Sequence, residues 1–287
     1  MMADLLMQLD SLWQRCHFPD PGGLRILGLR GCDVVDGQPV ANDGAFDRFR
    51  DTLFLFDPAA GRIDHVPCTA GQPGGYWDTM AGANAPWVRP NCALYTRGIH
   101  RGEYPCLVQA GSLRATVPVI RDVSGTPGVP SYSGGDFDYA LNTGIHIHHS
   151  AQQNEPAVGI WSDGCTVVDD GDGPLWTIVK AAVWGTYAAQ ETIWYGIAPF
   201  AWLGDSSVRL LMGSVDKADS AVTLLQQFLN THDGSSLAVT GQFNQETDEE
   251  YRSRQRGAGE TGDGVCTNPS FLPAPTPPQI VGGQVAS

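Results

Sequence analysis

The sequence is poor in lysine and contains no dense group of positive charges. Among its 287 residues only Lys180 and Lys217 are lysines, and the formal net charge at pH 7 is −14. A surface that binds the phosphates of nucleic acid requires clustered Lys and Arg side chains. We therefore expect that nucleic acid is not a partner of this protein.

Long apolar runs are missing as well. A helix needs about 18 or more consecutive apolar residues to cross a bilayer, and no such run exists, so we expect no membrane span. The start of the chain instead places Leu5, Leu9 and Leu12 at helical spacing among acidic residues, which predicts an amphipathic helix over residues 1–16. A signal peptide requires a basic head and an uninterrupted apolar core, so we expect none.

The seven cysteines form no Cys-x-x-Cys pair, which argues against a structural zinc site and against a redox dithiol. Buried thiols are the simplest interpretation, with disulfides as the alternative. The positions are Cys16, Cys32, Cys68, Cys92, Cys106, Cys165 and Cys266.

Glycine and proline, by contrast, are abundant, with 35 and 20 residues. They imply many turns, which favours strands over a helical bundle. The length suffices for one large domain and a small second one. We predict a mainly β (α+β) protein, in which a β-rich domain with flanking helices precedes a small α-helical C-terminal module.

Local patterns predict individual elements of the β-rich domain. Residues 123–142 are rich in Gly, Ser, Pro and Asp and should form a long loop, either a lid over a substrate or a plain surface excursion. Strands are expected over 24–31, 52–57, 193–203 and 208–212, and helices over 42–50 and 175–190.

The stretch from Gly144 to Val168 carries the candidate chemistry. The alternation in Gly-Ile-His-Ile-His-His-Ser predicts a strand with His146 and His148 on one face and His149 on the other. A Ser-Asp-Gly turn then delivers Cys165 at the start of an apolar run. A thiol beside an imidazole on a neighbouring strand is the layout of a Cys-His nucleophile pair, whereas the structural alternative is a buried thiol.

Two metal-binding interpretations compete with this one. His146 and His148 together with Cys165 could hold zinc, but no fourth ligand is evident, so we expect neither a metal nor another cofactor. Residues 169–173 resemble a calcium loop but lack the Glu at its twelfth position, so we expect an exposed turn there.

A His followed after this spacing by Ser-x-Gly-Cys resembles the catalytic motif of the L,D-transpeptidases, and phage and prophage relatives with Gly-Ile-Asn-Ile-His-Arg-Ser are more similar still. The resemblance covers roughly residues 24–168. It implies that Cys165 is the nucleophile and His148 the catalytic imidazole. Asp163 and Val167 depart from the family, which usually has His or Lys and then Arg at these positions.

The resemblance implies acyl transfer on the stem peptides of peptidoglycan, through a thioester at Cys165 and with oxyanion donors at the amides of Gly164 and Cys165. The outcome is hydrolysis, by an endopeptidase or carboxypeptidase, or L,D-transpeptidation. A catalytically inactive structural protein of a virion or tail, which uses the same fold for docking, is the alternative. The remaining candidates are Ser162 and His146 in the catalytic group, and His100, Arg101, Tyr95 and Asp163 in substrate binding.

Residues 214–256 resemble a small helical peptidoglycan-binding module, with a Leu-Gln-Gln-Phe-Leu helix, a Val-x-Gly-x-Phe turn and a helix that starts near Thr247. The expected division is a helix and linker over 1–23, the catalytic domain over 24–213, this module, and a Pro/Gly-rich tail over 257–287. Peptidoglycan and other virion or tail proteins are the expected partners. The protein would be particle-associated, or cytoplasmic until it is released by lysis.

Overall fold

The structure is a computed structural model, and it describes residues 2–45, 48–72, 86–110, 116–121, 136–140, 144–150, 157–159, 162, 164–267 and 269. The helices are α1 Met2–Arg15, α3 Pro174–Lys180, the π-helix η2 Ala181–Thr186, the 3-10 helix η3 Phe200–Trp202, α4 Ala221–His232 and α5 Gln245–Gly257. The strands are β1 Arg25–Arg30, β2 Cys32–Val35, β3 Gln38–Ala41, β4 Asp51–Asp57, β5 Arg62–Thr69, β6 Pro86–Val88, β7 Asn91–His100, β8 Tyr104–Gln109, β9 Val117–Arg121, β10 Asp136–Ala140, β11 Ile147–His149, β12 Thr166–Val168, β13 Thr192–Pro199, β14 Arg209–Leu210 and β15 Cys266–Thr267.

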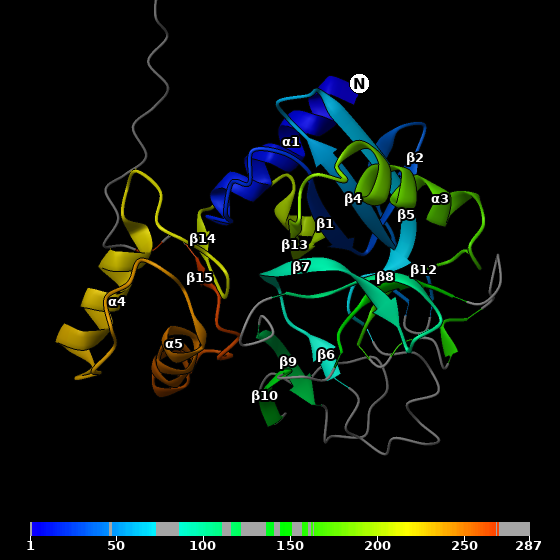
Figure 1. Ribbon diagram of the computed structural model, residues 1–287. Coiled ribbons are helices and arrows are strands. Elements are labelled where there is room, and N and C mark those ends of the chain that lie inside the picture. Colours follow the sequence, from blue (N-terminus) through cyan, green and yellow to red (C-terminus); the bar gives the residue numbers. More distant parts are fainter. Residues whose placement is uncertain are drawn as a thin grey trace, which may run out of the picture.

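Eight strands close into a barrel in the order β1-β13-β7-β8-β11-β12-β5-β4 (Figure 1). The pairs β1/β13 and β11/β12 are parallel, and the other neighbours in the barrel are antiparallel. Three small sheets accompany the barrel, in the orders β10-β9-β6, β14-β15 and β2-β3. The prediction of a mainly β protein is therefore confirmed.

Strand β4 shows why the barrel has two separate cores. All of its residues are buried, although successive side chains of a strand point to opposite faces. Leu53 and Leu55 belong to the core inside the barrel, whereas Phe54 and Phe56 pack outside it beneath α1. A strand buried on both faces has a continuous apolar sequence, as this one does.

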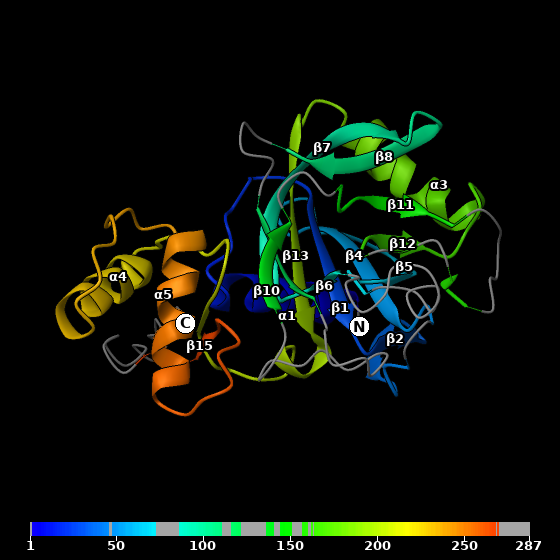
Figure 2. The same ribbon diagram turned by 90° about the horizontal axis from the view of Figure 1, so that it is seen from below.

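Helix α1 covers the outer face of β1 and β4, and its amphipathic pattern is confirmed (Figure 2). Leu9, Leu12 and Trp13 are fully buried, and each such side chain stabilises the fold by about 1.5–3 kcal/mol. The indole of Trp13 donates a hydrogen bond to the carbonyl oxygen of Pro19 at 2.8 Å, which fixes the exit of the helix.

Helix α3 and the π-helix η2 contribute to the barrel core through Trp176 and Val179. The predicted helix over 175–190 is correct in place but ends at Thr186. The turn before it is not wholly exposed, because the Asp170 carboxylate is buried and accepts a hydrogen bond from the Trp176 amide at 2.9 Å. A Cβ at Gly173 would lie 2.0 Å from Asp170 Oδ1, so only glycine fits there.

Three further expectations need correction. The predicted helix over 42–50 is not formed by the described residues 42–45 and 48–50. The side chain of Asn42 instead closes a loop, because it donates a hydrogen bond to the Arg50 carbonyl oxygen and accepts one from the Gly44 amide, both at 2.8 Å. Within 123–142, residues 136–140 form β10, while 122–135 and 141–143 lie outside the described residues. The predicted strand over 193–203 ends at Pro199, where η3 follows.

The C-terminal unit packs α4 and α5 to one side of the barrel, as both views show (Figure 1, Figure 2). Helix α5 begins two residues before Thr247, because Asn244 caps it by accepting a hydrogen bond from the Thr247 amide at 3.0 Å. Its small core includes Leu210 from β14 and Cys266 from β15. The unit thus draws on residues on both sides of the predicted range 214–256.

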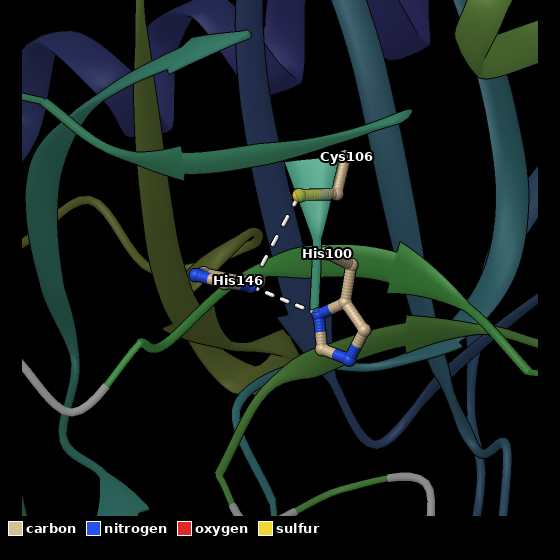
Figure 3. Close-up of side chains that lie close together, drawn as sticks. All are labelled: His100, Cys106 and His146. Carbon is tan, nitrogen blue, oxygen red and sulfur yellow. Dashed lines mark hydrogen bonds between the residues drawn. The ribbon is translucent and has the colours of Figure 1, made fainter. Parts of the chain in front are cut away.

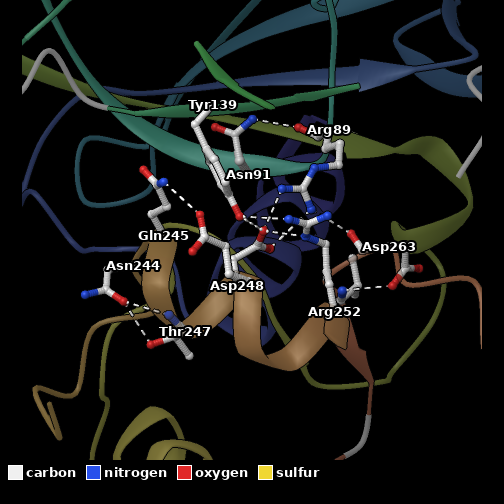
Figure 4. Close-up of polar contacts among 12 residues, drawn as sticks. Arg89, Asn91, Tyr139, Asn244, Gln245, Thr247, Asp248, Arg252 and Asp263 are labelled. Atoms are coloured by element: carbon white, nitrogen blue, oxygen red, sulfur yellow. Dashed lines mark hydrogen bonds and ion pairs between the residues drawn. The ribbon is translucent and has the colours of Figure 1, made fainter. Parts of the chain in front are cut away.

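A buried ionic network joins this unit to the barrel side (Figure 4). We call Arg89, Tyr139, Asp248 and Arg252 the junction cluster. Asp248 Oδ2 lies 2.6 Å from Arg89 Nη2, 2.6 Å from the Tyr139 hydroxyl and 3.0 Å from Arg252 Nε, and the Asp248 side chain is fully buried. Within the described ranges, no helix has both the length and the apolar content that crossing a membrane requires.

Candidate active site

The candidate site lies where β7, β8, β11 and β12 meet at one end of the barrel wall. Strands β7 and β8 form a hairpin in which His100 is paired with Tyr104 and Gly98 with Cys106. Because side chains alternate along a strand, Tyr104 and Cys106 share one face of β8. Strand β11 then pairs with β8 on one side and with β12 on the other.

Cys165 immediately precedes β12 and is 8% exposed. The parallel register pairs Ile147 with Thr166, so the residue opposite Cys165 is His146. The main-chain N–H of His146 donates to Cys165 Sγ at 3.4 Å, and the Sγ lies 3.5 Å from the Gly144 carbonyl oxygen. The thiol is therefore held by the backbone of the segment that carries the histidines.

The turn before Cys165 is shaped by Ser162 and Gly164. Ser162 Oγ lies 2.5 Å from the Gln72 carbonyl oxygen and 2.9 Å from that of Cys165, and it accepts a hydrogen bond from the Gly164 amide at 3.2 Å. Gly164 has φ +95°, and a Cβ there would lie 2.5 Å from the Pro86 carbonyl oxygen. Both residues thus determine how the thiol is presented. Asp163 lies outside the described residues.

Two histidines and a second thiol converge beside Cys165, and Figure 3 shows their side chains pointing toward one another. His100 Nδ1 lies 2.9 Å from His146 Nδ1, and Cys106 Sγ lies 4.0 Å from the same nitrogen. We call His100, Cys106, His146 and His148 the imidazole cluster. Sequence reasoning included its three histidines but not Cys106.

His148 occupies the innermost position of the imidazole cluster, with 1% of its surface exposed. Its ring stacks on that of His100 at a centroid distance of 4.1 Å. Its Nδ1 lies 2.8 Å from the His149 carbonyl oxygen and 3.3 Å from the Tyr104 hydroxyl. Nε2 is buried and has no hydrogen-bond partner in the described part of the chain. A proton on Nδ1 leaves Nε2 as the acceptor.

Burial sets the protonation states of the cluster. Burial, together with the neighbouring His100, lowers the pKa of His148 to about 3. It also lowers the pKa of His100 to about 4, where His146 and Arg101 add to the effect. Burial raises the pKa of the Cys106 thiol to about 12, and Cys165 contributes to this rise. At neutral pH these groups are therefore uncharged.

The remaining predicted residues take different positions. Tyr95 is 1% exposed and packs edge-on against Tyr195 inside the barrel, at a centroid distance of 5.4 Å, which is the position of a core residue. Arg101 is exposed in the β7–β8 turn with φ +49°. Its charge lowers the pKa values of His100 and His146, so it lies near the cluster without forming part of it.

Tyr104 and Cys106 are the residues that sequence reasoning missed. The signal was available in the pattern: Gly102 follows Arg101 in a turn, and a hairpin there folds Tyr104 and Cys106 back alongside His100. The ring of Tyr104 stacks on His100 at a centroid distance of 5.2 Å.

Comparisons with known proteins give no relative for this chain. No family model, no curated protein and no solved structure matches it.

Proposed function

We propose that this protein is a cysteine-dependent enzyme that acts on the stem peptides of peptidoglycan by acyl transfer, on an L,D-transpeptidase-like β-rich domain. The observation that supports the proposal best is the position of Cys165. Its thiol accepts the main-chain N–H of His146 at 3.4 Å, directly after a turn in which Gly164 has φ +95°. Three imidazoles lie on the adjoining strands.

The general base is assigned to His148 by the resemblance; its Nε2 is buried and free of a proton, but it makes no hydrogen bond to the Cys165 thiol. Strand register favours His146 as the second candidate, because it is the residue opposite Cys165. In either case the imidazole takes the thiol proton as the sulfur attacks the peptide carbonyl.

The reaction proceeds in two transfers. The C–S bond of a thioester forms, the peptide C–N bond breaks, and the imidazolium returns its proton to the departing amine. Water or an amine then attacks the thioester and releases Cys165. The amide of Gly164 donates to Ser162 Oγ in the structure, so an oxyanion role for this amide requires that the bond be exchanged. Water as the acceptor makes the enzyme a peptidase, and an amine makes it a transpeptidase.

The C-terminal unit is proposed to hold the enzyme on the cell wall. The support is its sequence pattern together with the packing of Leu225 and Leu229 of α4 and Phe243 of the turn in one small core. Association with a virion or an injection particle would bring the enzyme to its substrate.

An inactive docking protein is the second candidate, and two features favour it. A pKa of about 3 makes His148 a weak proton acceptor for a thiol. Val167, where the family has Arg, is fully buried, so this position offers no charge to a substrate carboxylate.

Incubation with purified peptidoglycan, followed by mass spectrometry of the released muropeptides, tests the proposal. Cys165→Ala should lower turnover by about 10³-fold or more, whereas Cys32→Ala, which removes a buried thiol on the outer side of the barrel, should leave it nearly unchanged. The larger loss among His146→Ala and His148→Ala identifies the base. Equal turnover by the parent and Cys165→Ala would exclude the thiol mechanism, and no turnover by the folded parent would favour the docking protein.

A further inference from the structure

We propose that His100, Cys106 and His146 form a binding site for a divalent transition-metal ion of the zinc class, beside Cys165 but without it as a ligand. One potential ligand atom from each of the three residues lies within 4.8 Å of the other two. The sequence had suggested different partners for His146, namely His148 and Cys165. The structure instead joins His146 to residues from the β7–β8 hairpin.

The spacing of the three atoms fits tetrahedral coordination after small side-chain rotations. Zn–N bonds of about 2.0 Å and Zn–S bonds of about 2.3 Å place two nitrogens about 3.3 Å apart and a nitrogen and sulfur about 3.5 Å apart. The observed distances are 2.9 Å between His100 Nδ1 and His146 Nδ1, and 4.0 Å between His146 Nδ1 and Cys106 Sγ. The first distance is about 0.4 Å shorter and the second about 0.5 Å longer than the ideal.

The chemistry of the donors points the same way. Two neutral imidazoles and one thiolate are the donor set that zinc and its neighbours prefer over magnesium or calcium. Burial lowers the pKa values of both histidines, so their lone pairs are available at neutral pH. Binding would displace the proton of Cys106, and the charge of the ion would stabilise the thiolate that burial otherwise disfavours.

The site is held rigidly by its surroundings. His100 ends β7, Cys106 lies within β8, and His146 immediately precedes β11, so three neighbouring strands of a closed barrel fix the donors. The ring of His100 contacts those of Tyr104 and His148, at centroid distances of 5.2 Å and 4.1 Å, which restricts its orientation. Supporting contacts of this kind orient metal ligands.

Three protein ligands leave a fourth position for an exchangeable group such as water or a carbonyl oxygen. His146 is partly exposed, whereas Cys106 is fully buried, so that position opens on the His146 side. Cys165 lies on this side as well, because the His146 amide donates to its sulfur. A bound ion would therefore adjoin the thiol of the proposed nucleophile.

Metal content and cobalt spectroscopy test the site on the full chain. The purified protein, freed of metal with a chelator, is titrated with Co²⁺ and with Zn²⁺. The parent should take up one ion per chain and show a thiolate-to-cobalt charge-transfer band. Cys106→Ser should remove that band and weaken binding at least about 100-fold, and His100→Gln should weaken binding similarly. Cys165→Ala should retain both the ion and the band.

Three results would overturn the proposal. Retention of the band in Cys106→Ser would assign the thiolate to another cysteine, and its loss in Cys165→Ala would make Cys165 the ligand. Equal metal uptake by the parent and the folded His100→Gln variant would show adventitious binding. If Cys106→Ser does not fold, as judged by circular dichroism, His146→Gln replaces it. These measurements do not involve turnover, so an inactive protein that binds the ion would refute the proposed function and not this site.

Discussion

The junction cluster and the imidazole cluster are both buried and polar, and they differ in how their charges are matched. In the junction cluster the carboxylate of Asp248 faces the guanidinium groups of Arg89 and Arg252, so opposite charges meet. In the imidazole cluster the neighbours that shift the pKa values of His100 and His148 are other histidines and Arg101, which are all potential cations. That cluster is stable only because its rings remain neutral.

The difference separates a structural role from a chemical one. A buried ion pair adds little net stability, but loss of one partner leaves an uncompensated charge in the interior. A group of neutral imidazoles around a thiol has lone pairs available for a proton or a metal ion. We infer that the junction cluster fixes the C-terminal unit in place and that the imidazole cluster carries the chemistry.

The largest effect is expected from breaking the junction cluster. Asp248→Asn should lower the free energy of unfolding by about 3–5 kcal/mol, because the buried charge of Arg89 loses its partner. Urea denaturation followed by tryptophan fluorescence measures the loss. The matched control is Asp233→Asn, which removes a partly exposed ion pair with Arg254 and should cost about 1 kcal/mol or less.

Equal losses in the two variants would show that burial does not distinguish the two ion pairs. A loss confined to the C-terminal unit, seen as a separate unfolding step, would show that this unit folds independently of the barrel.

A smaller effect is expected from the turn that presents Cys165. Gly164→Ala places a Cβ 2.5 Å from the Pro86 carbonyl oxygen at φ +95°, and the strain should cost about 1–3 kcal/mol. Displacement of Cys165 should also slow thiol alkylation or abolish turnover. Gly159→Ala is the control, because it has φ +55° and nothing within 4 Å of the added Cβ, so it tests backbone strain without the contact. If both variants lose equal stability, the contact with Pro86 has no importance.

The smallest effect concerns pH and a histidine that does have a carboxylate partner. His17 Nε2 lies 3.4 Å from Asp219 Oδ2, yet burial lowers the pKa of His17 more than Asp219 raises it. The unfolded chain therefore binds a proton near pH 6.5 that the folded protein resists, so stability should fall as the pH drops below 6.5. One histidine contributes a slope of at most about 1.4 kcal/mol per pH unit.

His17→Asn should flatten this part of the stability curve, and Asn tolerates the φ of +53° at this position. Asp219→Asn should extend the fall to lower pH, because the folded pKa of His17 decreases further. Urea midpoints measured between pH 7 and pH 4 provide the comparison. A steeper curve for His17→Asn would contradict the sign argued here.

The local sequence was sufficient to predict elements whose apolar pattern depends on their own residues alone. The apolar spacing of Leu5, Leu9 and Leu12 predicts α1, and the run around Phe54 predicts β4. It was not sufficient where one specific side-chain contact decides between a helix and a loop. The side chain of Asn42 closes a loop on Arg50 and prevents the helix that the amphipathic pattern there indicates.

The same limit applies to the candidate site. The turn before Cys165 and its spacing from the histidines are local, and sequence reasoning found them. Cys106 approaches His146 only because β8 pairs with β11. Tyr95 was assigned to the site by order along the chain, but its side chain faces the barrel core. The inward or outward orientation of a strand residue depends on register, and register depends on partners that the sequence does not identify.

The place of β13 in the barrel has a consequence for biosynthesis. It lies between β1 and β7, with Arg25 paired to Trp194 and Asn91 paired to Ile197. While the ribosome is still making residues 100–190, β1 and β7 therefore each have an unpaired edge, and such edges can pair with other chains. Closure requires contacts between residues far apart in sequence, which form slowly. Premature termination before Thr192 should therefore yield an aggregating fragment and not a smaller folded barrel.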